Sequence, residues 1–151
     1  MITVAKIFTT CFGIGYIQKG AGTIAALFCC AVWYAFRLDL LGWEWQLLQI
    51  ALLFLLGALA STKMEATWGH DSNRIVADEW LGMCVALFLV PFTWLNLAIA
   101  FVLFRAFDIG KPLFIRRAER FPKGWGVMMD DLLAGIYSNL ILHLLIKSHL
   151  F

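Results

Sequence analysis

Long apolar runs separated by short polar stretches organise this chain. Residues 23–36, 45–61 and 131–146 each predict an apolar helix, and residues 80–104 carry no charge over 25 positions. Residues 1–22 predict a short amphipathic segment followed by a glycine-rich loop, and Thr23 is in place to cap the next helix. The polar stretch 63–73 and the basic segment 105–123 separate the later runs. The pattern predicts an all-α protein.

The run 80–104 has two interpretations, because Pro91 interrupts it. A single kinked helix would rise about 37 Å and would separate Asp78 and Glu79 from Asp108. A helical hairpin that turns at Pro91 would bring these acids to the same end. Its arms would be short against a hydrocarbon core of about 30 Å, so they would need a thinned bilayer, a tilt or burial among other helices.

Composition points to a membrane protein. Hydrophobic residues make up 62% of the 151 positions and the mean hydropathy is +0.83, which exceeds what a globular core of this length needs. The four cysteines show no metal-ligand spacing and no phosphate-loop arginine, which argues against a cysteine phosphatase. We expect one membrane-embedded domain over residues 1–151, with membrane lipid and no nucleic acid as a partner. The oligomeric state is open.

Basic residues favour the hairpin. With a turn at Pro91, ten of the twelve Lys and Arg residues share one side of the membrane and only Arg37 and Lys147 lie on the other. The ten are Lys6, Lys19, Lys63, Arg74, Arg105, Lys111, Arg116, Arg117, Arg120 and Lys123. By the positive-inside rule that side is cytoplasmic. The sequence therefore predicts a multi-pass bundle of about five helical segments, including a short hairpin near Pro91.

Most acids lie at the edges of apolar runs, where charge near hydrocarbon is costly. Six of the ten carboxylates are placed in this way: Asp71, Asp78, Glu79, Asp108, Asp130 and Asp131. If they converge, they form a site for a hard cation such as Mg²⁺, which prefers oxygen ligands and substrate phosphate. His70, beside Asp71, is a candidate supporting group or proton donor.

A simpler interpretation competes with the metal site. Arg74 lies four residues before Asp78, and Arg105 lies three residues before Asp108, so both acids can form ordinary ion pairs within one helix. Glu79 and Asp131 have no such local partner. The local pairs therefore explain single acids better than they explain the whole set.

Basic residues and one glycine loop are candidates for binding phosphate. Arg105, Lys111 and Arg116 can contact phosphate oxygens, and arginine can do so with two parallel hydrogen bonds. The glycine loop ends at Gly22 and Thr23, where a helix N-terminus attracts anions. From spacing alone, a plain surface turn explains the loop better than a phosphate contact does.

Small residues follow both acidic doublets. Gly82 follows the first, and Ala134 with Gly135 follows the second. Such residues let helices approach closely at that level. Ordinary membrane packing explains them too, and is compatible with a site.

Three motifs in order resemble those of the phosphatidylglycerophosphatase A family over nearly the whole chain. They are Asp71-x-x-x-Ile75-Val76-x-Asp78-Glu79-x-x-Gly82-Met83, Phe104-Arg105-x-Phe107-Asp108-Ile109-x-Lys111-Pro112 and Gly124-x-Gly126-Val127-Met128-x-Asp130-Asp131-x-x-Ala134-Gly135. The chain departs from the family pattern in the glycine loop, where only Gly22 and Thr23 align with a proline-rich motif, and at Phe114, which replaces a second proline. These changes leave the acids untouched.

The resemblance implies a Mg²⁺-dependent enzyme of the bacterial inner membrane, with its site facing the cytoplasm. It would convert phosphatidylglycerophosphate to phosphatidylglycerol and phosphate. The residues that this assigns are Asp78, Glu79, Asp108, Asp130 and Asp131 for metal and catalysis, Arg105, Lys111, Arg116, Gly22 and Thr23 for substrate, and Asp71 and His70 in support. Attack by water and a phospho-aspartyl intermediate on Asp108 or Asp130 both stay open. A lipid phosphotransferase and a small transport or scaffold protein are the alternative functions.

Overall fold

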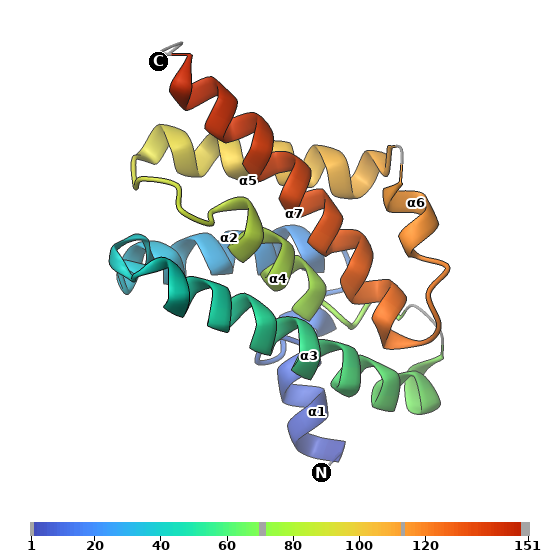
Figure 1. Ribbon diagram of the computed structural model, residues 1–151. Coiled ribbons are helices and arrows are strands. Elements are labelled where there is room, and N and C mark those ends of the chain that lie inside the picture. Colours follow the sequence, from blue (N-terminus) through green and yellow to red (C-terminus); the bar gives the residue numbers. More distant parts are fainter. Residues whose placement is uncertain (1, 70–71, 113, 149–151) are drawn as a thin grey trace.

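The computed structural model describes residues 2–69, 72–112 and 114–148, and these contain helices and turns but no strand (Figure 1). The α-helices are α1 (Ile2–Thr9), α2 (Ala21–Ala35), α3 (Trp43–Trp68), α4 (Ala77–Ala86), α5 (Trp94–Gly110), α6 (Ile115–Ala118) and α7 (Gly124–Lys147). Two single 3₁₀ turns lie at Ile14–Tyr16 and Leu38–Leu40. The five predicted segments correspond to α2, α3, α4, α5 and α7. The amphipathic segment is α1, and the short α6 lies in the basic stretch.

The chain reverses between α4 and α5, so the hairpin prediction is confirmed and the single kinked helix is wrong. Residues 87–93 form the turn, and Leu89 adopts a positive φ of 57°. The turn is held by polar side chains of other helices: the Leu89 N–H donates to Gln46 Oε1 at 3.0 Å, and Asn139 Nδ2 donates to the Phe88 carbonyl at 2.8 Å. At 1.5 Å per residue α4 is only about 15 Å long. It relies on its neighbours for burial.

Several helix boundaries differ from the predicted ones: α4 begins at Ala77, α5 continues to Gly110, and α2, α3 and α7 differ as follows. α2 begins at Ala21, and the residue before it, Gly20, has a positive φ of 77°. Thr23 therefore lies inside the helix and does not cap it. α3 continues to Trp68 through the stretch predicted to be polar loop. α7 begins at Gly124, where the backbone N–H donates to Thr62 Oγ1 at 3.2 Å. This contact with α3 stabilises a helix start that two glycines would otherwise weaken.

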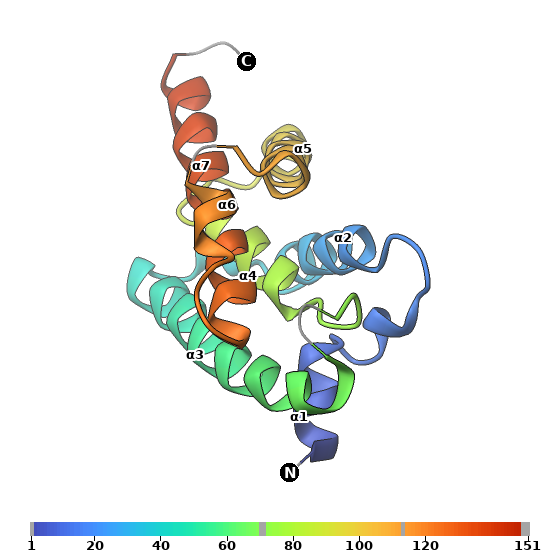
Figure 2. The same cartoon turned by 90° about the vertical axis from the view of Figure 1, so that its right-hand side faces the viewer.

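α4 lies at the centre of the molecule, with α2, α3, α5 and α7 around it (Figures 1 and 2). Its buried residues include Leu81, Met83, Cys84 and Ala86. Glycines bring α4 and α7 together, because a Cβ on Gly135 would lie 2.4 Å from the carbonyl oxygen of Gly82. The predicted close approach after the two acidic doublets is therefore confirmed, and it places the first turn of α4 beside the second turn of α7.

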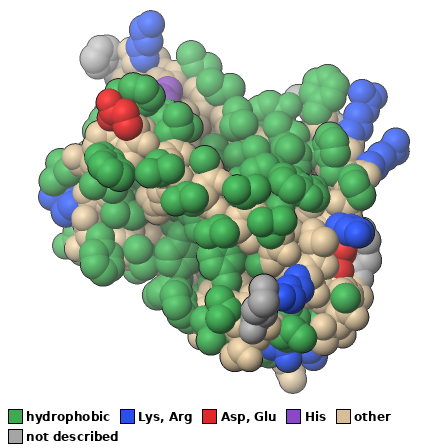
Figure 3. All heavy atoms as spheres, turned by 60° about the horizontal axis from the view of Figure 1, so that its bottom comes forward, with side chains coloured by type: hydrophobic (Ala, Val, Ile, Leu, Met, Phe, Trp, Pro, Cys, Tyr) green, Lys and Arg blue, Asp and Glu red, His purple; other side chains and the backbone are tan. Residues whose placement is uncertain are grey.

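Two helices, α3 and α7, are long and apolar enough to cross a membrane. α3 also exposes a row of large side chains, which are Leu47, Leu48, Leu52, Leu55, Leu56 and Leu59. Hydrophobic side chains cover the middle of the face in Figure 3, and most of the Lys and Arg side chains visible there lie at its right and lower edges. A soluble monomer rarely exposes so extensive an apolar surface.

Candidate active site

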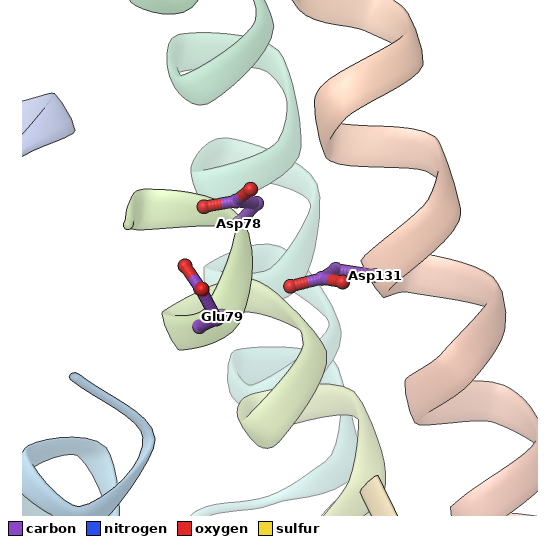
Figure 4. A group of neighbouring side chains, drawn as sticks. All are labelled: Asp78, Glu79 and Asp131. Atoms are coloured by element: carbon purple, nitrogen blue, oxygen red, sulfur yellow. The ribbon is translucent and has the colours of Figure 1, made fainter. Parts of the chain in front are cut away.

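Three carboxylates from two helices meet between α4 and α7. Asp78 and Glu79 lie in the first turn of α4, and Asp131 lies in the second turn of α7. One carboxylate oxygen from each lies within 4.8 Å of the others, and Figure 4 shows the three side chains gathered at the gap between the helices. The helix contact at Gly82 and Gly135 brings these sequence-distant acids together. This arrangement can hold a divalent cation, with further positions open to water and substrate.

Each of the three acids has one buried carboxylate oxygen that lacks the hydrogen-bond partner such atoms normally have. Asp78 Oδ1, Glu79 Oε2 and Asp131 Oδ2 are buried and accept no hydrogen bond from any described residue. A buried charge without a partner is costly, and three of like sign repel one another. The residues present therefore fit a hard cation, which would compensate all three charges at once.

Arg105 and Asp108 extend the cluster from the last turns of α5. The Arg105 guanidinium donates to Asp108 Oδ2, and its Nη1 lies 3.9 Å from Glu79 Oε1. The local ion pair that the sequence suggested for these two residues therefore forms. It also reaches α4, so the pair belongs to the cluster and is not an isolated surface contact.

Lys111 connects the second acidic doublet to the basic segment. Its Nζ donates to Asp130 Oδ2 at 2.7 Å and also to Glu119 Oε1, and the Asp131 N–H donates to Asp130 Oδ1 at 3.0 Å. Burial alone would lower the pKa of Lys111, but the hydrogen bonds that Lys111 donates to Asp130 and Glu119 outweigh it and raise the pKa above its ordinary value. Both carboxylates therefore favour the charged form of Lys111.

The N-terminus of α2 packs against the acids from the other side. A Cβ on Gly22 would lie 1.9 Å from Glu79 Oε1, so only glycine fits there while the Glu79 side chain keeps its place. Gly20, Ala21 and Gly22 all line the same hollow as the carboxylates. The first N–H groups of a helix attract anions, so this wall suits a phosphate.

These groups enclose a cavity of about 350 Å³. Its charged lining residues are Asp78, Glu79, Arg105, Asp108, Lys111, Asp130 and Asp131. Five acids against two cations leave the cavity negative, so a phosphate needs a bound cation to enter it. The charge balance and the oxygen-rich lining together suit phosphate chemistry assisted by a metal ion.

Other candidates from the sequence lie elsewhere. Arg116 is exposed on α6 and Thr23 is half-buried on α2, and neither lines this cavity. Their positions give no support to the predicted substrate contacts, because charge and spacing do not tell which way a helix faces. His70 and Asp71 lie outside the described residues.

Two features of the site had no clear signal in the sequence. Glu119, which binds Lys111, lies among basic residues and follows no motif. Arg74 does not pair with Asp78, although the spacing suggested it. Its guanidinium instead lies 6.0 Å from the ring centre of Tyr16 and 5.7 Å from that of Trp68. Tyr16 is distant from Arg74 in sequence, and Trp68 lies in α3, which ends before Arg74. Spacing along the chain could therefore not predict this packing.

Comparison with known proteins identifies the family of this chain. A family model described as Phosphatidylglycerophosphatase A matches residues 7–146. A Bacteroides thetaiotaomicron protein named "Putative phosphatidylinositol-3-phosphatase" is 41% identical over 140 residues, covering 88% of this chain and 87% of that protein. Proteins named phosphatidylglycerophosphatase A from Haemophilus influenzae and Escherichia coli are 40% and 34% identical, over 86% and 87% of this chain and 81% and 77% of their own lengths. No solved structure matches. The chain belongs to the phosphatidylglycerophosphatase A family.

Proposed function

We propose that this chain hydrolyses the terminal phosphate monoester of phosphatidylglycerophosphate, with Mg²⁺ bound at Asp78, Glu79 and Asp131. Phosphatidylglycerol and inorganic phosphate are the products. The family and its two relatives named phosphatidylglycerophosphatase A support the activity. The observation that carries the site is the convergence of three buried carboxylates within 4.8 Å, each with an oxygen that accepts no hydrogen bond from a described residue.

The remaining charged residues have separate roles in this proposal. Bound Mg²⁺ supplies positive charge for the phosphate and for a water that attacks it. Arg105 and Lys111 contact phosphate oxygens, and the start of α2 at Gly22 closes the opposite wall. Asp108 holds Arg105, and Asp130 and Glu119 hold Lys111. Neither Arg116 nor Thr23 lines the cavity, so the structure gives no argument for a role of either residue. His70 and Asp71 lie outside the described residues.

Attack by water is favoured over a phospho-aspartyl intermediate. The two acids considered as nucleophiles, Asp108 and Asp130, each accept a hydrogen bond from a cation. A carboxylate held in this way is a weaker nucleophile, because its charge is already compensated. Rapid quench with labelled lipid checks the assignment: phosphate trapped on the protein would contradict it.

We also propose that the protein is a multi-pass protein of the bacterial inner membrane, with its site facing the cytoplasm. Gly124 at the start of α7 contacts Thr62 near the end of α3, so the two long helices run antiparallel. The opposite end of the bundle carries Arg37, which lies over the Phe92 ring at 5.6 Å, close to the α4–α5 turn. This distribution leaves most basic residues at the site end, as the positive-inside rule expects for a cytoplasmic face.

A phosphoinositide is the second candidate substrate, because the Bacteroides relative that carries the inositol lipid in its name is 41% identical. Both lipids present a phosphate monoester on a phosphodiester-linked headgroup, and the acidic site does not discriminate between them. A phosphotransferase would need an acceptor alcohol. A transport or scaffold protein would show no turnover.

Phosphate release from purified protein in mixed micelles tests the proposal. We expect release from phosphatidylglycerophosphate that requires Mg²⁺, stops on chelation, and exceeds the rate on phosphatidylinositol 3-phosphate. Asp78→Asn should abolish it. Asp39→Asn is the matched control, since Asp39 pairs with Arg37 at the far end of the bundle. Release without an added alcohol rules out transfer as the sole activity, and the absence of metal-dependent release would overturn the proposal.

A further inference from the structure

A second hollow adjoins the active-site cavity and contains Arg74. It has a volume of about 310 Å³ and is lined by Gly15, Tyr16, Ile17, Gln18, Asn73 and Arg74. Ile17, Gln18 and Asn73 line the active-site cavity as well, so the two hollows share a wall. A ligand that reaches the acids with one end can therefore extend into the second hollow with the other.

Two aromatic rings hold Arg74 in place. Its guanidinium lies over the rings of Tyr16 and Trp68, and those rings meet edge to face with their centres 6.3 Å apart. No ion pair joins Arg74 to an acid among the described residues. Cation–π contacts orient a guanidinium while leaving its N–H donors available. Arg74 can therefore accept an anion as a further partner.

The two cations that line the active-site cavity differ from Arg74, because both already have carboxylate partners. Arg105 already donates to Asp108, and Lys111 already donates to Asp130 and Glu119. Their charge is thus already paired with carboxylates, and in the proposed function they contact the monoester only beside the bound cation. Of the cations that line either hollow, Arg74 is thus the one that has no carboxylate partner among residues 2–69, 72–112 and 114–148.

The surroundings of Arg74 fit a lipid headgroup. The segment that carries Tyr16 also exposes Phe12 and Ile17, over 79% and 41% of their surfaces. Aromatic and apolar side chains beside an arginine are typical of the membrane–water interface, where the phosphodiester of a glycerophospholipid lies. A soluble phosphate compound would gain nothing from these neighbours.

We propose that Arg74 binds the phosphodiester of the lipid substrate while the terminal monoester occupies the acidic cavity. This inference rests on the proposed function and adds a second phosphate site to it. In phosphatidylglycerophosphate a three-carbon glycerol unit joins the two phosphates, which matches two adjoining hollows with a shared wall. Arg74 then favours lipids that carry a phosphodiester. It binds this diester equally tightly in the substrate complex and in the transition state.

The two reaction products report on the two sites separately. Inorganic phosphate competes for the monoester site, and phosphatidylglycerol carries only the diester. In Arg74→Gln we expect the KM for phosphatidylglycerophosphate and the inhibition constant of phosphatidylglycerol each to rise about tenfold, the size expected for one lost charge-assisted contact. The kcat and the inhibition constant of phosphate should stay unchanged, because binding that is uniform along the reaction affects KM alone.

Two further variants complete the experiment. Arg74→Lys keeps the charge and should recover part of the affinity for phosphatidylglycerol. Arg120→Gln removes an exposed arginine of the basic segment that lines neither hollow and should match the wild type. An unchanged inhibition constant of phosphatidylglycerol in Arg74→Gln, or an equal rise for both products, would overturn the inference alone. A wild-type protein that releases no phosphate would overturn the proposed function with it.

Discussion

Asp130 and Asp131 are adjacent in sequence, but their carboxylates have different neighbours. Asp131 joins Asp78 and Glu79 in the three-acid cluster, whereas Asp130 binds Lys111. We therefore expect Asp131→Asn to raise the Mg²⁺ concentration for half-maximal activity at least about tenfold, as losses around metal sites do. Asp130→Asn should leave that concentration nearly unchanged and raise the KM for lipid, because Lys111 loses one of two contacts. Mg²⁺ titrations at saturating lipid measure the difference.

The doublet also allows a stability readout. In metal-free protein, Asp131→Asn removes one of three mutually repelling buried charges, so the melting temperature should rise or stay level while activity falls. A fall in both would show that Asp131 has a structural role instead. Equal Mg²⁺ dependence in the two variants would contradict the division of the doublet.

At the residue scale, sequence reasoning identified charges better than contacts. Asp78, Glu79 and Asp131 could be found because acids beside hydrocarbon are costly, so their presence needs a reason. Arg116 and Lys111 have the same charge in the same segment, yet only Lys111 lines the cavity. Whether Arg116 reaches the cavity depends on the direction in which the single turn of α6 faces. The local sequence pattern does not encode that direction. Glu119 was missed for the same reason.

At the scale of elements, the start of α2 sets the position of Glu79. Gly22→Ala should lower kcat/KM at least about tenfold, because the new methyl group displaces the Glu79 carboxylate, and misplacements near 1 Å can cost up to about 100-fold. The melting temperature should change little, since the group displaced is the flexible end of a side chain. Kinetics and thermal unfolding of the same preparation check this, and unchanged activity would contradict the contact.

The contact between α4 and α7 depends on backbone approach instead. In Gly135→Ala the methyl group meets the Gly82 carbonyl oxygen and the Val85 side chain, neither of which can move without shifting a helix. We expect a loss of about 1–3 kcal/mol in the free energy of unfolding, typical of overpacking, together with lost activity. Gly110→Ala is the control for stability, because the nearest atom of a described residue to its Cβ would be Pro112 Cδ, at 4.0 Å. Equal stability of the two variants would refute this packing.

Element boundaries show where local patterns fail. The apolar runs predicted α2, α3, α5 and the body of α7, and Pro91 predicted the turn. The sequence missed the first turns of α7, because Gly124 and Gly126 suggest a loop; packing of Gly124 against Thr62 and Ala58 of α3 outweighs that preference. α3 continues past Ser61 because Lys63, Met64, Glu65 and Ala66 are all good helix formers.

At the scale of the whole molecule, the α4–α5 turn and the basic segment should lie on opposite sides of the membrane. The turn packs against Gln46 and Asn139, far along α3 and α7 from the site, and the other end carries Arg120 in the loop before α7. Leu89, exposed over 49% of its surface, is suited to a labelling test. The four native cysteines are buried and should give a low background.

In spheroplasts we expect Leu89→Cys to react with a membrane-impermeant maleimide added outside, or to be shielded from both sides if the short hairpin ends within the bilayer. Arg120→Cys should react only after the membrane is opened, because it lies with the basic residues that the positive-inside rule keeps in the cytoplasm. Both variants should retain Mg²⁺-dependent activity, which confirms that the labelled protein is folded. Reaction of Leu89→Cys only from the cytoplasmic side would place the turn and the site together. That result would exclude the proposed orientation, since the charges at Arg37 and Lys147 would then share a side with the other ten.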